Sequence, residues 1–383
     1  MIYLVILLLI IWGVINFDNK QETPQSKCYL FFIWLILTLV AGLRYKVGGD
    51  TIGYFEQYKT WQDIGSFSFA IAQDSRFAIG YQLLWAICKS INPNFWFYQL
   101  VHAVIVNTTF FIFFRKTKNR TFLAILLYYL YSFFFYNMEI LRAAIAVCVF
   151  IYSLKFYFDK KWLLYYGCSL IALLFHSEAI VLFLFPLVSY LNKVKITVIS
   201  LFGIIILSFI VLSVVNLVPI VNDFIISIGL MENGLIDFYS RARDYNINSI
   251  IAIFIQILPV VMILYLYRYD TTFRFKGFLI LYIILTILTL KYSVLIGRIN
   301  DFITPIVLFC IANIFAKNQF TFIDNKSFFK ITILSLFLFS TIFNYTKNTY
   351  YPDYKKYYPY SSVFSPQENI EREWYVRDML TNR

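Results

Sequence analysis

Apolar runs nearly as long as a bilayer core follow one another along the whole of this 383-residue chain. An α-helix needs roughly 20 apolar residues to cross the hydrocarbon of a membrane. The composition agrees, because 60% of the residues are hydrophobic and 14% are charged, with a mean hydropathy of +0.70, whereas soluble domains carry about 25% charged residues. No stretch remains for a large soluble domain. The sequence therefore predicts a polytopic membrane protein.

Apolar segments throughout the chain are candidate spans, and we expect about 12–13 membrane segments. They are residues 1–17, 28–43, 77–92, 95–114, 121–136, 140–158, 162–176, 178–192, 196–218, 249–267, 277–296, 299–316 and 328–344. All are predicted to be helices, because hydrocarbon offers no partner to an open strand edge. Several are short enough to be re-entrant. The expected fold is an all-α helical bundle over residues 1–345, with a Tyr- and Pro-rich tail, 346–383, on the outer face.

The first apolar run is predicted to be a span. It lacks the basic start and the small-residue cleavage site of a signal peptide. The five cysteines lie singly in or beside apolar runs, without a CxxC pair, so neither a disulfide framework nor a metal site is indicated. A P-loop and a nucleophile elbow are also missing, and the sequence predicts no cofactor.

Lysine and arginine give a net charge of +12 but lie mostly in short loops between the apolar runs. Such loops mark the cytoplasmic side of a membrane protein. The basic loops are residues 115–120, 155–161, 193–195, 268–276 and 317–330. Because the basic side chains do not line a polar helix face, we expect membrane lipid as a partner and no nucleic acid.

Counting spans from these loops assigns the other segments to the outer face. The outer segments are Arg142, the turn at His176, the loop 219–248, Arg298 and the tail. Residues 44–76 are ambiguous, because counting through every candidate span places them inside, whereas the chemistry argued below requires them outside. Either one of 77–92 and 95–114 does not cross fully, or Arg44 has no functional role.

Charged side chains flanked by apolar sequence are functional candidates, because each costs roughly 2.5–3.5 kcal/mol at the centre of a membrane. In AGLRYKVGGDTIGYF (41–55), Arg44 ends a span and two glycines lead to Asp50. Adjacent glycines permit turns that would present backbone amides and Asp50 to a ligand. The alternative is a snorkelling arginine beside a solvated loop.

Two further candidates pair opposite charges at a spacing of i, i+3. Glu139 and Arg142 are expected on one helical face, and the small residues after Arg142 would let neighbouring helices approach closely. Arg298 and Asp301 have the same spacing near the outer end of a span. Each pair is either a local ion pair or part of a ligand site.

His176 is one of only two histidines and is followed by Ser177 and Glu178, between two apolar runs. Histidine titrates near neutrality, so it can take a proton from a hydroxyl and return it. The carboxylate two residues later favours function over a structural histidine. His102, which has no acidic neighbour, is interpreted as a core residue.

Arg241 and Arg243 lie among aromatic residues in the outer loop 219–248. Arginine forks match phosphate oxygens, and aromatic faces suit the apolar faces of sugars; a plain solvated loop is the alternative. The outer arginines, the histidine and the carboxylates together favour a large, phosphate-bearing, hydroxyl-rich substrate that is reached from the membrane.

At these same places the sequence resembles the EpsG family of Wzy-type polysaccharide polymerases. The matching segments are GLRYKVGGD at 42–50 with Tyr54 following, Arg142 with Ile145 and Ala146, Lys160 and Lys161 before FHSEA at 175–179, and GRINDF at 297–302. They span about residues 40–310. The chain departs from the family at Ala143, where Gln is common, and at Ser177 and Glu178, where a small or basic residue and then Ser are common.

The resemblance implies a membrane glycosyltransferase that joins oligosaccharide repeat units linked to undecaprenyl pyrophosphate at the outer face of a bacterial inner membrane, as in O-antigen, lipopolysaccharide or exopolysaccharide synthesis. The lipid-linked donor and acceptor are then its partners, and a chain-length regulator protein is compatible with that role. We predict that His176, oriented by Glu178 or by a backbone group, is the general base on the acceptor hydroxyl. The residues predicted to hold or bind the pyrophosphate-bearing substrate are Arg142, Arg44, Arg298, Asp50, Asp301, Arg241 and Arg243.

Two alternatives stay open. An O-antigen ligase-like enzyme would use the same donor with a different acceptor. A flippase or exporter of lipid-linked oligosaccharide would share the spans, but such transporters usually carry an internal repeat, which is not visible in this sequence. The sugars, the linkage and the oligomeric state are not specified by the sequence.

Overall fold

A computed structural model describes residues 2–69, 77–117, 119–214, 247–270, 272–316, 326–346 and 352–374. Within these residues the regular structure is helical, without a strand, so the predicted all-α fold is confirmed. The chain divides into two compact units. Unit 1 comprises Met1–Ala179 and Phe343–Arg383, and unit 2 comprises Ile180–Ile342.

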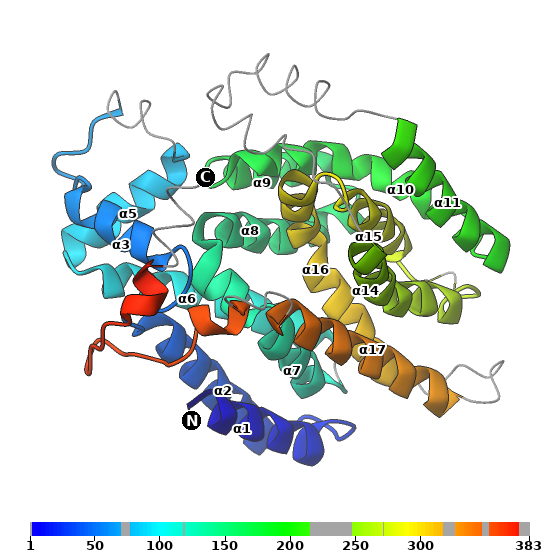
Figure 1. Cartoon of the computed structure of the whole chain (residues 1–383), viewed down its shortest axis with the longest axis horizontal. Helices are drawn as coiled ribbons and strands as arrows, with labels where there is room; N and C mark the ends of the chain where they lie inside the picture. The colour runs from blue at the N-terminus through cyan, green and yellow to red at the C-terminus, as the bar shows by residue number, and fades with distance from the viewer. Residues whose placement is uncertain are drawn as a thin grey trace. The chain divides into compact units, whose positions relative to one another are not determined.

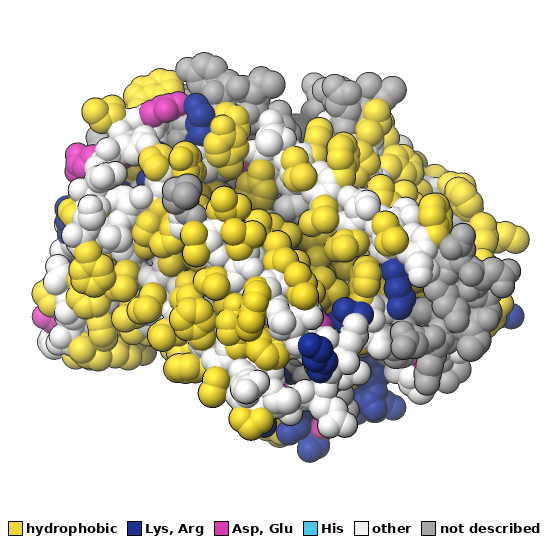
Figure 2. Space-filling model, turned by 90° about the horizontal axis from the view of Figure 1, so that it is seen from below, with side chains coloured by type: hydrophobic (Ala, Val, Ile, Leu, Met, Phe, Trp, Pro, Cys, Tyr) yellow, Lys and Arg dark blue, Asp and Glu magenta, His cyan; other side chains and the backbone are white. Residues whose placement is uncertain are grey.

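Five of the described helices are long and apolar enough to cross a membrane, and seven shorter apolar helices accompany them. The long ones are Pro24–Gly42, Phe95–Thr117, Leu141–Phe158, Ser249–Leu266 and Ile296–Ala316. Hydrophobic side chains cover much of the face seen in Figure 2, as lipid-facing helices require. The chain is thus a polytopic membrane bundle.

Unit 1 is built from antiparallel helix pairs (Figure 1). Its helices are α1 (Ile2–Phe17), α2 (Pro24–Gly42), α3 (Thr51–Thr60), α5 (Ile79–Ile91), α6 (Phe95–Phe114), α7 (Thr121–Tyr131), α8 (Leu141–Phe158) and α9 (Trp162–Leu173), with a π-helix (Phe135–Glu139) before α8 and short 3-10 helices at Arg115–Thr117 and Asp353–Lys356. The main packing pairs are α2 with α6, α8 with α9 and α1 with α7. Thr23 and Ser26 form a capping box that starts α2.

Unit 2 centres on α15 (Lys276–Leu288), which packs against four neighbours. They are α10 (Val188–Leu191), α11 (Val198–Val214), α14 (Ile247–Leu266) and α16 (Ser293–Ala316). A 3-10 helix (Ser177–Leu187) leads into the unit, and α17 (Lys326–Thr346) leads out of it. Asn192 accepts a hydrogen bond from the Gly277 backbone N–H at 2.7 Å, which satisfies a donor in the first turn of α15.

One end of unit 1 carries its basic loops, and we call it the basic end. Asp18, just after α1, accepts hydrogen bonds from two backbone N–H groups at the start of α7, at 3.1 and 2.9 Å. Arg115, after α6, pairs with Glu22, before α2, at 2.9 Å. The pKa of Lys116 is lowered by burial and by the nearby positive charge of Lys155, near the end of α8. The loops that the sequence assigns to the cytoplasm in this unit therefore meet.

The opposite ends of the same helices form what we call the tail end. There the loop after α2, the π-helix before α8, the turn after α9 and the segment 352–374 come together. The Tyr45 backbone N–H donates to the Ser361 carbonyl at 2.8 Å, and the Gly80 N–H donates to the Leu174 carbonyl at 2.7 Å. The predicted outer-face tail is thus an ordered cover over the loop after α2.

The segment 77–92 does not carry the chain from one end of unit 1 to the other. It is therefore removed from the candidate spans. Trp34 of α2 donates to Thr108 of α6 at 3.2 Å, and Gly42 lies against Leu100. Because α2 and α6 are antiparallel, the end of α2 and the start of α6 lie at the same end of the unit. The helices α3 and α5, which connect α2 to α6, start and finish at that same end. Residues 44–69 therefore lie at the tail end, together with Arg142 and His176.

Candidate functional site

Arg44 lies inside the loop that follows α2, with only 1% of its surface exposed. Its guanidinium donates to the carbonyl of Val47 at 3.0 Å, to the carbonyl of Ala41 and to the Thr51 hydroxyl at 3.4 Å. Burial lowers its pKa to about 10, so it stays protonated at neutral pH. These contacts give Arg44 a role in shaping the loop, and its predicted contact with the pyrophosphate stays a prediction.

The two glycines of this loop fit against the π-helix before α8. Gly48 has a φ of +110°, a conformation that favours glycine. The Gly49 N–H donates to the Glu139 carboxylate at 2.6 Å. Asp50 follows at the start of α3, half-buried and within electrostatic reach of Glu139. The predicted presentation of backbone amides therefore occurs, but the group that receives one is Glu139.

Glu139 and Arg142 are not on one continuous helical face, as their spacing suggested. The π-helix ends at Glu139, and Ile140 interrupts the helix with a non-helical conformation, φ −89° and ψ 52°, before α8 begins. Arg142 instead donates through Nε to the Tyr54 hydroxyl at 3.3 Å, and its guanidinium carbon lies 4.8 Å from the centre of the Phe77 ring. Arg142 is half-buried, so its guanidinium is desolvated on one side by aromatic rings.

Arg142 and Phe175, the residue before His176, border the same cluster of buried aromatic side chains. The cluster includes Tyr54, Phe77, Tyr81, Trp85 and Tyr98, with Leu141 and Ile145 from the first turns of α8. Phe175, immediately before His176, packs against it. The helices α8 and α9 are neighbours in sequence and in space, so the start of one and the end of the other meet at the tail end.

His176 is held in a buried turn by Glu178. The His176 Nδ1 atom lies 3.3 Å from the Glu178 carboxylate and 3.3 Å from the Glu178 backbone nitrogen. The two residues are 6% and 8% exposed. In the neutral imidazole the Glu178 N–H donates to Nδ1. Nε2 accepts a proton only in the tautomer whose Nδ1–H faces the Glu178 carboxylate.

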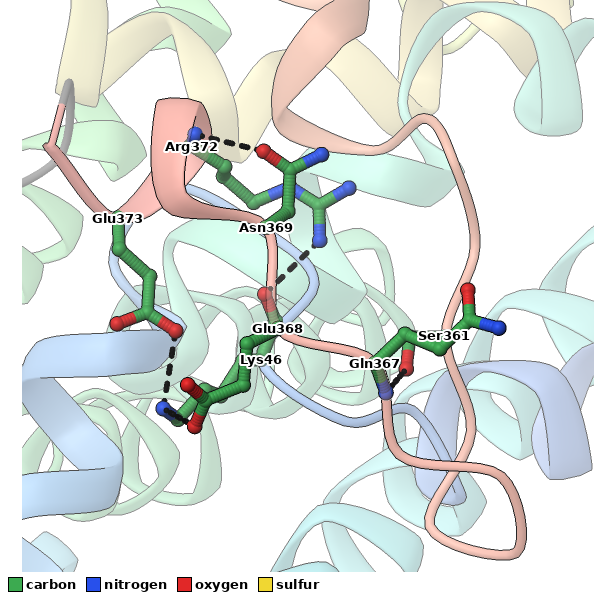
Figure 3. Close-up of polar contacts among 7 residues, drawn as sticks. All are labelled: Lys46, Ser361, Gln367, Glu368, Asn369, Arg372 and Glu373. Atoms are coloured by element: carbon green, nitrogen blue, oxygen red, sulfur yellow. Dashed lines mark hydrogen bonds and ion pairs between the residues drawn. The ribbon is translucent and has the colours of Figure 1, made fainter.

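The tail is fastened to the loop after α2 by charged groups (Figure 3). Lys46 Nζ lies 2.9 Å from the carboxylates of both Glu368 and Glu373. Arg372, which is 1% exposed, donates to the carbonyls of Lys46 at 3.1 Å and Pro359 at 2.6 Å. Lys46 and Arg372 carry no local signal in the sequence, because the contacts between the loop and the tail join positions more than 300 residues apart. The bond from Arg372 to Pro359 is the exception.

Two of the predicted site residues that the structure describes belong to unit 2. Arg298 and Asp301 lie, half-buried, in the first half of α16. Between them, Asn300 donates to Thr286 of α15 at 3.0 Å, which fixes the face that α16 turns toward α15. Their convergence with Arg142 and His176 stays a prediction. Arg241 and Arg243 lie outside the described residues.

His102 is a core residue, as interpreted from the sequence. It is fully buried in α6, and its Nε2 lies 2.9 Å from the Leu141 carbonyl. In the part of the chain that the structure describes, no three His, Cys, Asp or Glu side chains lie close enough together to hold a metal ion.

Comparison with protein families gives a match over residues 27–362 to the model of the EpsG family. Searches of curated proteins and of solved structures found no significant match. The match covers the loop after α2, both histidines, Arg142, Glu178 and α16. The chain therefore belongs to the EpsG family, a Wzy-like family of membrane polysaccharide polymerases.

Proposed function

We propose that this protein polymerises oligosaccharide repeat units linked to undecaprenyl pyrophosphate at the outer face of a bacterial inner membrane. The observation that supports the proposal is that Arg142 and Phe175, the residue before the buried His176–Glu178 pair, pack on one aromatic cluster, at the end of unit 1 opposite to the basic loops. A fixed cation and a proton acceptor at one site suit a reaction that expels an anion and deprotonates a hydroxyl.

The proposed orientation follows from the charges at the two ends of unit 1. Basic loops stay in the cytoplasm during membrane insertion. When 77–92 is removed from the spans, counting the remaining spans places every basic loop of the chain on one side of the membrane. The same count places the segment 44–69 on the other side. This supports a site that faces the outer side of the membrane.

In the proposed reaction, a hydroxyl of the acceptor unit attacks the anomeric carbon that joins the donor chain to pyrophosphate. His176 Nε2 takes the hydroxyl proton, a new glycosidic bond forms, and the bond to the pyrophosphate oxygen breaks. Undecaprenyl pyrophosphate then leaves with the bonding electron pair. Arg142 stabilises the departing negative charge, because a preorganised cation in a dry site acts most strongly where charge develops.

Arg298, Arg241 and Arg243 are proposed as further contacts to the pyrophosphate-bearing substrate. Asp50 and Asp301 are proposed as contacts to the same substrate. Arg44 has an indirect place in this proposal, through the loop that it holds. A chain-length regulator protein is a further proposed partner at the outer face.

The test is complementation of a deletion strain at equal protein levels. We expect Arg142→Ala to lower polymerisation about a hundredfold or more and His176→Ala to lower it by about 10²–10⁴. Arg115→Ala is the matched control, since Arg115 makes a half-exposed ion pair at the basic end, of the kind worth about 0–1 kcal/mol. The readout is the ladder of surface polysaccharide.

A normal ladder from both Arg142→Ala and His176→Ala would refute the assignment. Long polymer that stays on undecaprenyl pyrophosphate in the deletion strain would indicate a ligase instead. Single repeat units trapped on the cytoplasmic side would indicate a transporter.

A further inference from the structure

A pocket of about 440 Å³ lies at the tail end of unit 1, and neither Arg142 nor His176 lines it. Its walls are the loop after α2, Phe55 of α3, the start of α6 and three tail residues, Val363, Phe364 and Pro366. Its size is within the range of pockets that hold small ligands, about 300–1,000 Å³.

The lining combines aromatic rings with amide and cationic groups. The aromatic residues are Tyr45, Phe55, Phe95, Trp96 and Phe364, and the polar ones are Arg44, Lys46, Asn94 and Gln99. Gln99 and Arg44 are 2% and 1% exposed and hydrogen-bond to each other, so they fix the floor of the pocket. Rings that offer flat faces, with a few fixed hydrogen-bonding groups, suit a ligand with both apolar faces and hydroxyl groups, which describes a sugar ring.

The tail wall of the pocket is held in place at both ends. The Val363 N–H donates to the Leu43 carbonyl at 2.9 Å, and the Gln367 N–H donates to the Ser361 hydroxyl at 2.8 Å (Figure 3). Between these points Phe364 is 82% exposed. Phe364 therefore presents an accessible aromatic face at the pocket.

The helix α3 connects the pocket with the proposed reaction site. Tyr54 accepts the hydrogen bond of Arg142, and the next residue, Phe55, lines the pocket. A glycan bound at the pocket would therefore lie beside the helix that carries the Arg142 contact.

We propose that this pocket is a sugar subsite that holds the glycan during polymerisation, with Trp96 and Phe364 stacking on sugar rings and with Asn94 hydrogen-bonding to hydroxyl groups. The choice of a glycan as ligand rests on the proposed function. The tail is the wall that completes the subsite.

The test is calorimetric titration of the full-length protein in lipid nanodiscs. The probe is the set of oligosaccharides released from the host's own surface polysaccharide by partial acid hydrolysis, and maltoheptaose is the unrelated control sugar. We expect saturable binding of the host oligosaccharides and at least tenfold weaker binding to Trp96→Ala and to Phe364→Ala. Trp96→Phe, which keeps an aromatic face, should recover part of the affinity.

Trp374→Ala is the matched control, because it removes an exposed ring from the same tail but outside the pocket. Affinity unchanged by Trp96→Ala and Phe364→Ala, or absence of saturable binding to the wild type, would overturn the subsite. This binding assay does not depend on turnover, so its failure is separate from failure of the His176 and Arg142 variants in the ladder assay. In cells, we expect Phe364→Ala to shorten the ladder without abolishing it.

Discussion

At the residue scale, Glu139 ties three segments of unit 1 together. Its carboxylate accepts hydrogen bonds from the Gly49 N–H, at 2.6 Å, and from the Tyr357 hydroxyl, while the charge of Lys356 acts on it. The loop after α2, the π-helix and the tail thus share one buried carboxyl group. A buried carboxyl group with several partners specifies one arrangement of those partners, because any other arrangement leaves its polar atoms without hydrogen bonds.

Gly48 is where this arrangement is most easily tested. A Cβ at this position would lie 2.7 Å from the Thr51 hydroxyl oxygen and would also meet the Met138 carbonyl, on a backbone with φ +110°. We expect Gly48→Ala to lower the free energy of unfolding by about 1–3 kcal/mol, measured by thermal unfolding in nanodiscs. Gly65→Ala is the control, because its Cβ would meet only Asp63, at an ordinary 3.5 Å. Equal melting temperatures for the two variants would contradict this account of the loop.

Individual residues were predicted to different degrees. Arg142, His176 and Glu178 stand out in the sequence because charge inside apolar runs is costly, and the structure brings them to one end of unit 1. Arg44 stood out for the same reason, but its role depends on which carbonyls surround it, which the sequence does not show. Glu139 received no site role, because a π-helix and a break at Ile140 are set by tertiary packing.

At the element scale, α5 shows why hydropathy alone miscounts spans. Its 13 residues, Ile79–Ile91, are too few for a perpendicular crossing. It buries Tyr81, Trp85 and Cys88 on one side, and Lys89 near its end donates to the carbonyls of Tyr58 and Lys59 at 3.0 and 2.9 Å. The apolar side chains of α5 thus pack into the aromatic cluster.

Cysteine labelling tests this topology directly. We expect Gly65→Cys and Glu368→Cys to react with a membrane-impermeant maleimide in spheroplasts, because both positions lie at the tail end. Lys116→Cys, at the basic end, should react only after the membrane is permeabilised. The background is a variant in which the five native cysteines are replaced by serine, checked for a normal ladder. Labelling of Gly65→Cys only after permeabilisation would mean that 77–92 crosses the membrane.

At the scale of the whole molecule, the C-terminal residues of the chain pack into the unit that its first 179 residues form. Unit 1 takes in residues up to Ala179 and again from Phe343 onward. The tail contacts α1 as well, because the Tyr3 hydroxyl donates to the Tyr357 carbonyl at 2.9 Å. The sequence could indicate a tail that covers a site, but contacts between positions so far apart carry no local signal in a single sequence.

Arg372 is the residue on which the closure of unit 1 by the tail depends most. It is buried and donates to carbonyls of both the loop and the tail, and hydrogen bonds from a charged group contribute about 1.5–3 kcal/mol. Lys355 makes a solvent-exposed pair with Glu371, of a kind that contributes little to stability. We therefore expect Arg372→Ala to speed chymotrypsin release of a C-terminal tag by roughly 10- to 100-fold, because cleavage follows local opening, and Lys355→Ala to change it little. Similar rates for the two variants would show that the tail is held by its aromatic contacts and not by this arginine.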